Sequence, residues 1–349
     1  MTAALDAGRR VVVLRTPIAS RRIGVRAAAV TAAAAVLAAA VGVVALTLGE
    51  SALSVPEVLG ALAGTGEPRA RLVVVEWRLP RVLAGLLFGV ALGVGGAIFQ
   101  SLTRNPLGSP DIIGFDAGAY TGALLVITTV GTGVAATAAG AIAGGAATAL
   151  VVYLLAFRRG FQGFRLIIVG IGIASMLSSL NSWIILNADL NLALLASAWG
   201  SGSLNAVTFE QVAVAACVIV PLAIAAACLA DRMHLLELGE DAAAALGVRT
   251  GAVRVALIVV GVGITAVVTA MAGPIAFIAL AAPQIARRLT GSAGVTLTAS
   301  AAVGALLLVA SDVLAQRLFA PSQLPVGLVT VCLGGVYLIW LLIQEARRR

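Results

Sequence analysis

The sequence predicts an all-α integral membrane protein with about ten transmembrane helices. Of its 349 residues, 61% are hydrophobic and only 11% are charged, whereas a soluble globular domain carries about 25% charged residues. The apolar residues form runs of about twenty, which is the length of a helix that crosses the hydrocarbon layer. Because so few polar side chains cannot cover a surface that faces water, lipid must be the solvent of this chain.

Ten apolar runs qualify as spans, and their composition favours helices over strands. The runs are rich in Ala, Leu and Gly and lack the strict alternation of a transmembrane strand. The first run follows an Arg-rich segment (residues 1–26) without a clear cleavage site, so we expect a retained span and not a signal peptide. We expect residues 27–345 to form one transmembrane domain, with spans at 27–48, 80–103, 113–131, 134–157, 165–187, 208–230, 253–272, 274–290, 294–314 and 325–344.

The arginines test this count and set the orientation. All 23 basic residues are arginines; with ten spans, eighteen of them lie on the side of the N-terminus and five on the other. Basic residues mark the cytoplasmic side of a membrane protein, so both termini are expected in the cytoplasm. The same segregation explains the net charge of +8 without a nucleic-acid partner.

Glycines recur at four-residue spacing inside two of the expected spans. Gly85, Gly89 and Gly93 share one helix face, and Gly140 and Gly144 share another. Small residues at this spacing let helix backbones approach closely in lipid. A dinucleotide-binding loop is excluded because no strand precedes these glycines. We therefore expect close helix packing at both sites.

Motifs for catalysis or energy conversion are missing from the sequence. A Walker motif requires a lysine, and the chain has none. The single histidine, His234, cannot form a triad or a metal cluster alone, and no C-x-x-C spacing links Cys217, Cys228 and Cys332. We expect no catalytic residue, no metal site and no cofactor bound by this chain.

Acidic residues are expected only near the ends of spans. Asp189 and Asp312 fall near outer ends, whereas Asp111 and Asp116 fall near the inner end of the third span. An ion-coupled transporter needs ionisable groups near the membrane midplane. Energy for transport is therefore expected to come from another polypeptide.

The longest predicted cytoplasmic loop, residues 231–254, contains a short amphipathic pattern. Leu235, Leu238, Ala242 and Leu246 recur at helical spacing, and acidic residues stand where a helix N-terminus favours them. The loop could be a plain surface hairpin. The alternative is a short helix that docks in a groove of a cytoplasmic partner.

A second cytoplasmic segment, "FQSLTRNPLGSPDIIGFDAG" (99–118), has a specific set of turn residues. Its prolines stop helix continuation, Asn105 precedes a proline, and Gly108 permits tight backbone geometry. We expect a structured turn formed by Asn105, Pro106, Leu107 and Gly108. A role for this turn in gating is a hypothesis.

Several blocks together resemble the permease subunits of type II ABC importers for iron siderophores, haem and cobalamin. The blocks are "EWRLPRVLAGLLFGVALGVGGAIFQSLTRNPLGSPDIIGFDAGA" (76–119), "WGSGSL" (199–204), "LLELGEDAAAALGV" (235–248), "AGPIAFIALAAPQIARRLTG" (272–291) and "QLPVGLVTVCLGGVYLIWLL" (323–342). The first block and "FRLIIVGIGIASML" (164–177) look most like the ferric enterobactin permeases. The resemblance implies the type II importer fold, with ten helices and cytoplasmic termini.

The resemblance also implies a working assembly. The chain would be a non-enzymatic subunit of the cytoplasmic membrane, paired with a second permease over two ATPase subunits that hold ATP and Mg. A binding protein would deliver a ferric siderophore from outside; haem or cobalamin import is the alternative within the family, and an ion-coupled secondary transporter or a membrane scaffold is the alternative outside it. Which chelate is carried, and whether the permease pair is a homodimer or a heterodimer, stays open, although the closest resemblance suggests a heterodimer.

Particular residues match the family's functional segments. The residues that match its ATPase-coupling helices are Leu238, Gly239, Glu240, Asp241, Ala244, Leu246 and Gly247, within the coupling segment 235–248. Arg78, Arg81 and Arg317 match arginines that dock the binding protein; snorkelling to lipid headgroups is the alternative. Gln284 departs from the family, which often has a histidine there.

Overall fold

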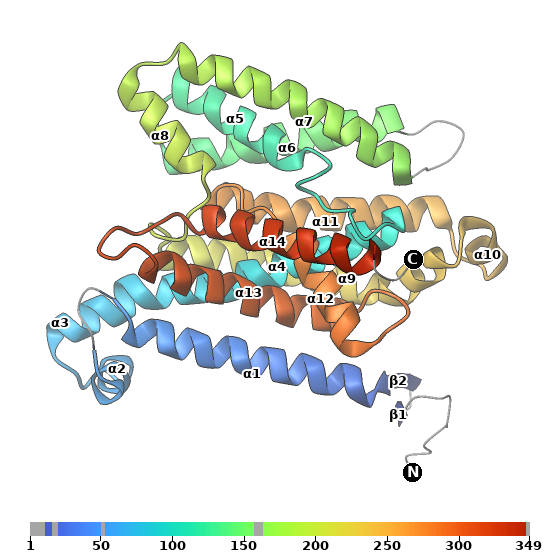
Figure 1. Cartoon of the computed structure of the whole chain (residues 1–349), viewed down its shortest axis with the longest axis horizontal. Coiled ribbons are helices and arrows are strands. Elements are labelled where there is room, and N and C mark those ends of the chain that lie inside the picture. The colour runs from blue at the N-terminus through green and yellow to red at the C-terminus, as the bar shows by residue number, and fades with distance from the viewer. Residues whose placement is uncertain (1–10, 16–19, 50–52, 157–162, 347–349) are drawn as a thin grey trace.

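The computed structural model describes residues 11–15, 20–49, 53–156 and 163–346, and it is a bundle of helices (Figure 1). Both described ends of the chain lie at one end of the bundle, together with α10, whereas α2 and α3 lie at the other end. We name these the α10 end and the α2 end. The elements are β1 (Val11–Arg15), β2 (Ser20–Gly24), α1 (Val25–Thr47), α2 (Val55–Leu62), α3 (Pro68–Arg71), the π-helix η1 (Leu72–Arg78), α4 (Leu79–Thr103), α5 (Phe115–Thr129), α6 (Val134–Ala156), α7 (Gly163–Leu186), α8 (Leu190–Gly200), α9 (Phe209–Glu237), α10 (Glu240–Ala245), α11 (Thr250–Ala272), α12 (Ile278–Thr290), α13 (Leu297–Arg317) and α14 (Val326–Ala346).

Each of the ten expected spans coincides with a helix. In the part of the chain that the structure describes, seven helices are long and apolar enough to cross a membrane: α1, the continuous helix over 68–103, α6, α7, α9, α11 and α13. The other three spans correspond to α5, with 15 residues, α12, with 13 residues, and α14, whose apolar stretch is described to Trp340. The chain is thus a multi-pass membrane protein, and crossing by these three shorter helices stays a prediction.

A short β-hairpin precedes the first membrane helix. β1 pairs antiparallel with β2, with Val11 opposite Gly24 and Arg15 opposite Ser20. Only an Arg-rich segment was expected over residues 1–26, of which 1–10 and 16–19 lie outside the described residues. The run Val11, Val12 and Val13 is β-branched, which favours a strand. The strand was not predicted because this β-branched run is short.

Small residues bring α4 and α13 together, as the glycine spacing predicted. A Cβ on Gly89 would lie 2.5 Å from the Cα of Ala305, and one on Gly93 would lie 2.2 Å from the carbonyl oxygen of Ser300. Gly122 and Gly140 make an equivalent contact between α5 and α6. Backbones at such distances leave no room for a side chain, so both glycine ridges are helix contacts.

The eighth expected span begins later than the sequence indicates. Residues 273–277 are not helical, and α12 begins only at Ile278. Gly273 and Phe277 both have positive φ, of 73° and 70°. Pro274 prevents α11 from continuing as a helix. Non-helical backbone inside a membrane bundle has to be satisfied by protein, and the side chain of Asp111 accepts a hydrogen bond from the Phe277 amide at 3.1 Å.

Candidate functional site

The predicted coupling segment forms a short exposed helix at the α10 end. Gly239 stands before α10 with φ of 115°, and Gly247 follows it with φ of 82°. Leu238 and Leu246 are 66% and 61% exposed, and Asp241 and Ala244 are also exposed. Ala243 is fully buried and anchors the helix on the main core. Two large apolar side chains are thus exposed on either side of α10.

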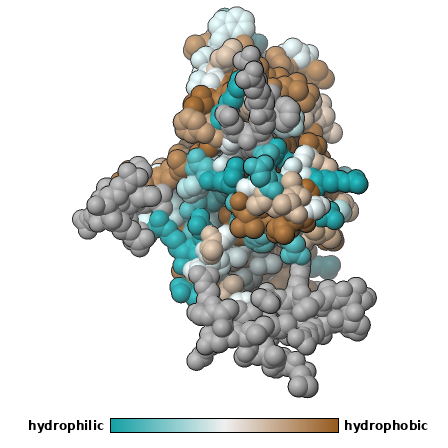
Figure 2. All heavy atoms as spheres, turned by 90° about the vertical axis from the view of Figure 1, so that its right-hand side faces the viewer, coloured by the Kyte–Doolittle hydropathy of each residue, from teal (hydrophilic) through white to brown (hydrophobic). Residues whose placement is uncertain are grey.

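Glu240 lies on the inner side of this helix. Its carboxylate forms an ion pair with the guanidinium of Arg254 on α11, which is 8% exposed. Removing one partner of such a pair leaves a buried charge without compensation. Glu240 therefore fixes α10 to α11, while Leu238 and Leu246 face outwards. Figure 2 shows this end of the molecule, with hydrophilic residues gathered across its middle beside a hydrophobic patch.

The turn that follows α4 is structured as expected. Arg104 ends α4 in the left-handed region, with φ of 49°, and the Asn105 side chain accepts a hydrogen bond from the Leu107 amide at 2.9 Å. A Cβ on Gly108 would lie 2.1 Å from the Thr103 hydroxyl, so a side chain at position 108 would require that hydroxyl to move. Leu107 is exposed.

A buried amide network fixes this turn to α12. The side-chain NH2 of Gln284 donates to the Gln100 side chain at 2.8 Å and to the Pro106 carbonyl at 3.0 Å, and Gln100 in turn donates to the Leu280 carbonyl at 2.9 Å. Both glutamines are buried. The position at which the family often has histidine is thus a hydrogen-bonded link between α4, the turn and α12.

A cavity of about 180 Å3 lies where these elements meet. Ser101, Arg104, Glu237, Arg287 and Gly294 line it, among other residues. The apolar part of α9 ends at Ala230, and the charged residues that follow carry the helix beyond the span. Glu237, the last residue of α9, lies with its carboxylate 3.6 Å from Nδ1 of His234.

This proximity gives a pH prediction. The nearby Glu237 carboxylate raises the pKa of His234 against the effect of burial, and the charge of Asp231 raises it further. The charged form of His234 is therefore stabilised at low pH, and the interaction is lost as pH rises through the raised pKa. We expect Glu237→Gln to move the His234 titration to lower pH. NMR of the chain labelled at its single histidine measures this, with Glu210→Gln as the control; an unchanged titration would contradict the pairing.

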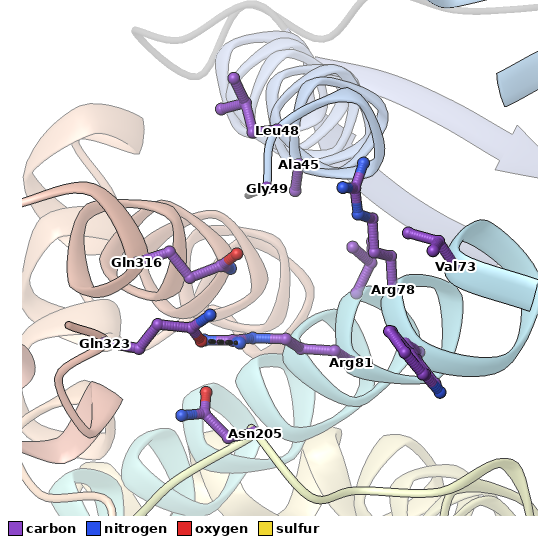
Figure 3. Close-up of a pocket in the computed structure, with 11 residues that line it drawn as sticks. Ala45, Leu48, Gly49, Val73, Arg78, Arg81, Asn205, Gln316 and Gln323 are labelled. Carbon is purple, nitrogen blue, oxygen red and sulfur yellow. Dashed lines mark hydrogen bonds between the residues drawn. The ribbon is translucent and has the colours of Figure 1, made fainter. Parts of the chain in front are cut away.

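Two of the three predicted docking arginines, Arg78 and Arg81, line a cavity of about 340 Å3 at the α2 end (Figure 3). Arg78 points toward the end of α1 and donates to the Leu46 carbonyl at 2.8 Å. Arg317 is exposed, and its nearest hydrogen-bond acceptor is the Gly49 carbonyl at 3.5 Å. Arg78 and Arg317 thus both satisfy carbonyl groups at the C-terminal end of α1, which a helix terminus leaves without partners.

Arg81 is the most enclosed of the three. Nε and Nη2 both donate to the carboxylate of Asp312 at 2.8 Å, and Nη1 donates to Gln323 at 2.9 Å. The side chains of Arg81 and Asp312 are only 11% and 5% exposed. A bidentate pair of this kind links α4 to α13 at the α2 end.

Two carboxylates lie deeper in the bundle than the sequence suggested. The Asp116 side chain accepts a hydrogen bond at 3.3 Å from Thr269, which lies nineteen residues, or roughly 28 Å, along α11 from its start. Asp111 accepts from Phe277 at the N-terminus of α12, inside the bundle. The expectation that no carboxylate lies deep was therefore wrong, because residues 109–114 continue into the bundle before α5 begins at Phe115. Because deep carboxylates are present, their expected absence no longer counts against ion coupling.

Serines line one exposed side of α7. Ser175, Ser179 and Ser182 are exposed, and each hydroxyl donates to the carbonyl four residues earlier at 2.9–3.0 Å. This local bonding satisfies the hydroxyls in an apolar environment. Nevertheless, the repeated hydroxyl groups make this face of α7 more polar than a helix face that contacts only lipid needs to be.

Three structural partners were missed in the sequence. Arg254 and Gln100 carried no motif, and their roles depend on partners that are 14 and 184 residues away. Asp312 did carry a signal, since a carboxylate in an otherwise apolar helix indicates a buried partner. Its partner Arg81 lies 231 residues away, which the sequence alone cannot pair.

These features together define the class of the protein: a multi-pass membrane protein with a short exposed helix at one end and a non-helical break inside the bundle. The chain belongs to the FecCD transport family, whose model matches residues 27–344.

Individual relatives agree with this assignment. The chain is 53% identical over 304 residues to the ferric enterobactin transport system permease protein FepG of Escherichia coli (strain K12), covering 87% of this chain and 92% of that protein. It is 34% identical over 303 residues to the probable siderophore transport system permease protein YfhA of Bacillus subtilis (strain 168), covering 84% and 88%. A solved structure described as an inward-facing, metal-chelate type ABC transporter matches with a TM-score of 0.81 and 25% identity, over 91% of this chain and 99% of that one.

Proposed function

We propose that this chain is a permease subunit of an ATP-driven importer that carries a ferric siderophore across the cytoplasmic membrane. The observation that carries the proposal is the 53% identity to a ferric enterobactin permease over 87% of the chain. Ferric enterobactin is therefore the first substrate to test. Other relatives transport ferric hydroxamates and ferric citrate, so a different ferric chelate is the second candidate.

The test of substrate is uptake by a strain that lacks this chain. Four probes are compared: ferric enterobactin, a ferric hydroxamate, haem and cobalamin. We expect uptake of ferric enterobactin alone to be lost and to return with the cloned gene. Loss of another probe in its place would assign that substrate, and unchanged uptake of all four would contradict the proposal.

We further infer that ATP is bound and hydrolysed by partner subunits. The sequence has no lysine for a Walker motif, and the exposed Leu238 and Leu246 give α10 an apolar surface for docking. The assembly would contain two ATPase subunits that hold ATP and Mg, a second permease and an extracytoplasmic binding protein. The short α10 suits a groove on an ATPase, as a helix that inserts between two surfaces of its partner.

Substitutions on either side of α10 test this docking surface. Leu238→Glu combined with Leu246→Glu replaces the apolar contacts by charges, and we expect ATP-driven uptake to fall at least about tenfold, the effect of about 1.4 kcal/mol. The control is Leu238→Met with Leu246→Met, which keeps the surface apolar. Normal uptake in the glutamate variant, at equal amounts of chain in the membrane, would rule out α10 as the coupling helix.

At the α2 end we propose that Arg317 and Arg78 contact acidic groups of the binding protein. Arg317 is exposed and Arg78 is partly exposed, and charges at the rim of an interface mainly set encounter rate and orientation. Arg81 is enclosed by Asp312 and Gln323, so we assign it to holding α4 against α13. Inside the membrane, the serine face of α7 is the candidate lining of the transport pathway.

A further inference from the structure

The last residue of α9, Glu237, is not part of the predicted coupling set, which begins at Leu238. Only Leu238 and Gly239 separate it from α10. Movement of α10 against a partner is thus passed to the backbone at Glu237 as well as to α11, to which Glu240 is paired. The elements that surround the Glu237 carboxylate are the ones that this movement would displace.

The Glu237 carboxylate is inserted between α4 and the loop that joins α12 to α13. Its side chain is 21% exposed, and a Cβ on Gly294 would lie 2.4 Å from Oε2. On the other side is Ser101, two residues before the end of α4. Oε1 of Glu237 and the Ser101 hydroxyl are both buried and make no hydrogen bond of good geometry.

Burial of this carboxylate oxygen has a cost in free energy. A buried carboxylate oxygen without a hydrogen bond loses the hydration that it has in water. Burial opposes ionisation here, but His234, Ser101 and the Val295 amide together hold the pKa of Glu237 below its ordinary value. An ionised side chain is therefore retained in a cleft that a glycine at position 294 makes wide enough.

Basic residues from three elements lie near this carboxylate. His234 belongs to α9 and lies 3.6 Å away, and Arg104 at the end of α4 and Arg287 on α12 line the same cavity. Arg104 also approaches the base of α10, since a Cβ on Gly239 would lie 3.9 Å from its Nη1. The end of α9, the turn after α4 and the end of α12 therefore meet around one cavity, with Glu237 as the acidic residue among its lining residues.

We propose that Glu237 is the positioning residue that links the coupling helix to the transport pathway. When α10 moves, the carboxylate pushes against Ser101 and the turn after α4 on one side and against the Gly294 loop with α12 on the other. Through the Gln100–Gln284 network the same movement reaches the N-terminal half of α12. This inference rests on the proposed function, because it assigns a role within ATP-coupled transport.

The test measures transport and ATP hydrolysis together. The full transporter is purified through an affinity tag on this chain and reconstituted in proteoliposomes, with radiolabelled ferric enterobactin as the probe. Glu237→Gln keeps the shape of the side chain and removes its charge. We expect substrate transported per ATP hydrolysed to fall about five- to tenfold, as for the loss of a coupling free energy, while ATP hydrolysis continues.

Gly294→Ala tests the same cleft without changing a charge. The added methyl group displaces the carboxylate, and we expect the same fall in transport per ATP. The matched controls are Glu210→Gln, at the opposite end of α9, and Gly251→Ala, where nothing lies within 4 Å of the added Cβ. Both controls are expected to keep the wild-type ratio.

The possible outcomes separate this inference from the proposed function. If the wild-type complex shows no ATP-driven uptake, the proposed function fails. If the wild type transports and both test variants keep its ratio of transport to ATP, only the role of Glu237 is overturned. A fall of transport and ATP hydrolysis in equal proportion would show a merely structural role and would also overturn it.

Discussion

Arg81→Ala is expected to destabilise the protein by about 3–5 kcal/mol, because it leaves the Asp312 carboxylate buried without its partner. Both Arg81 nitrogens lie 2.8 Å from Asp312 oxygens, and the Asp312 side chain is only 5% exposed. The pair joins α4 to α13 where neither helix has another ion pair in the described chain. The measurement is the thermal unfolding midpoint of the purified chain in detergent, together with its yield.

Two further variants separate the ion pair from other effects. Arg81→Asp with Asp312→Arg restores opposite charges, and we expect it to recover part of the lost stability. Arg317→Ala removes an arginine at the same end that is exposed, so its midpoint should stay near that of the wild type. An Arg81→Ala midpoint equal to that of Arg317→Ala would contradict the structural role of Arg81.

Gly93→Val is expected to have a comparable effect for a steric reason. The first added carbon would lie 2.2 Å from the Ser300 carbonyl oxygen, which belongs to the backbone of α13 and cannot rotate away. The helices must separate, and overpacking of this severity costs about 3 kcal/mol. We expect a lower unfolding midpoint and a smaller yield of folded chain.

The control for this variant is Gly335→Val. Nothing lies within 4 Å of a Cβ at that position on α14, so the same change of residue type there should leave the midpoint nearly unchanged. Equal midpoints for the two variants would mean that α4 and α13 do not pack as closely as the glycine contacts show.

The membrane helices could be predicted because lipid imposes a simple rule on sequence. A helix in hydrocarbon needs a long apolar run, and its loops carry their charges on a preferred side. The boundaries of α1, α4 and α6 accordingly lie within two residues of the expected spans. The glycine ridges could be predicted for the same reason, since small residues are what lets helices approach in lipid.

Irregular backbone was harder to predict. The non-helical residues 273–277 are as apolar as the helices around them, and their conformation depends on acceptors supplied from elsewhere, such as Asp111. The depth of Asp116 was misjudged in the same way, because the chain between α4 and α5 continues into the bundle. Hydropathy reports which residues avoid water, and it does not report where a chain turns inside protein.

The predicted coupling segment could be recognised in the sequence, but its contacts with other elements could not. Leu238 and Leu246 follow a local helical period and were predicted to belong to a segment that docks a partner. Arg254, Ser101 and Gly294 depend on contacts between elements that are distant along the chain. Such pairs become visible only when the fold brings the elements together.

The most direct test of the whole account is ATP-driven uptake by the reconstituted transporter. Proteoliposomes containing the complex purified through this chain are supplied with binding protein and ferric enterobactin, with ATP on the side of the ATPase subunits. We predict uptake that requires ATP and is absent from vesicles containing this chain alone. Uptake by the chain alone, driven by an ion gradient without ATP, would contradict the account and would turn attention to the deep carboxylates of Asp111 and Asp116.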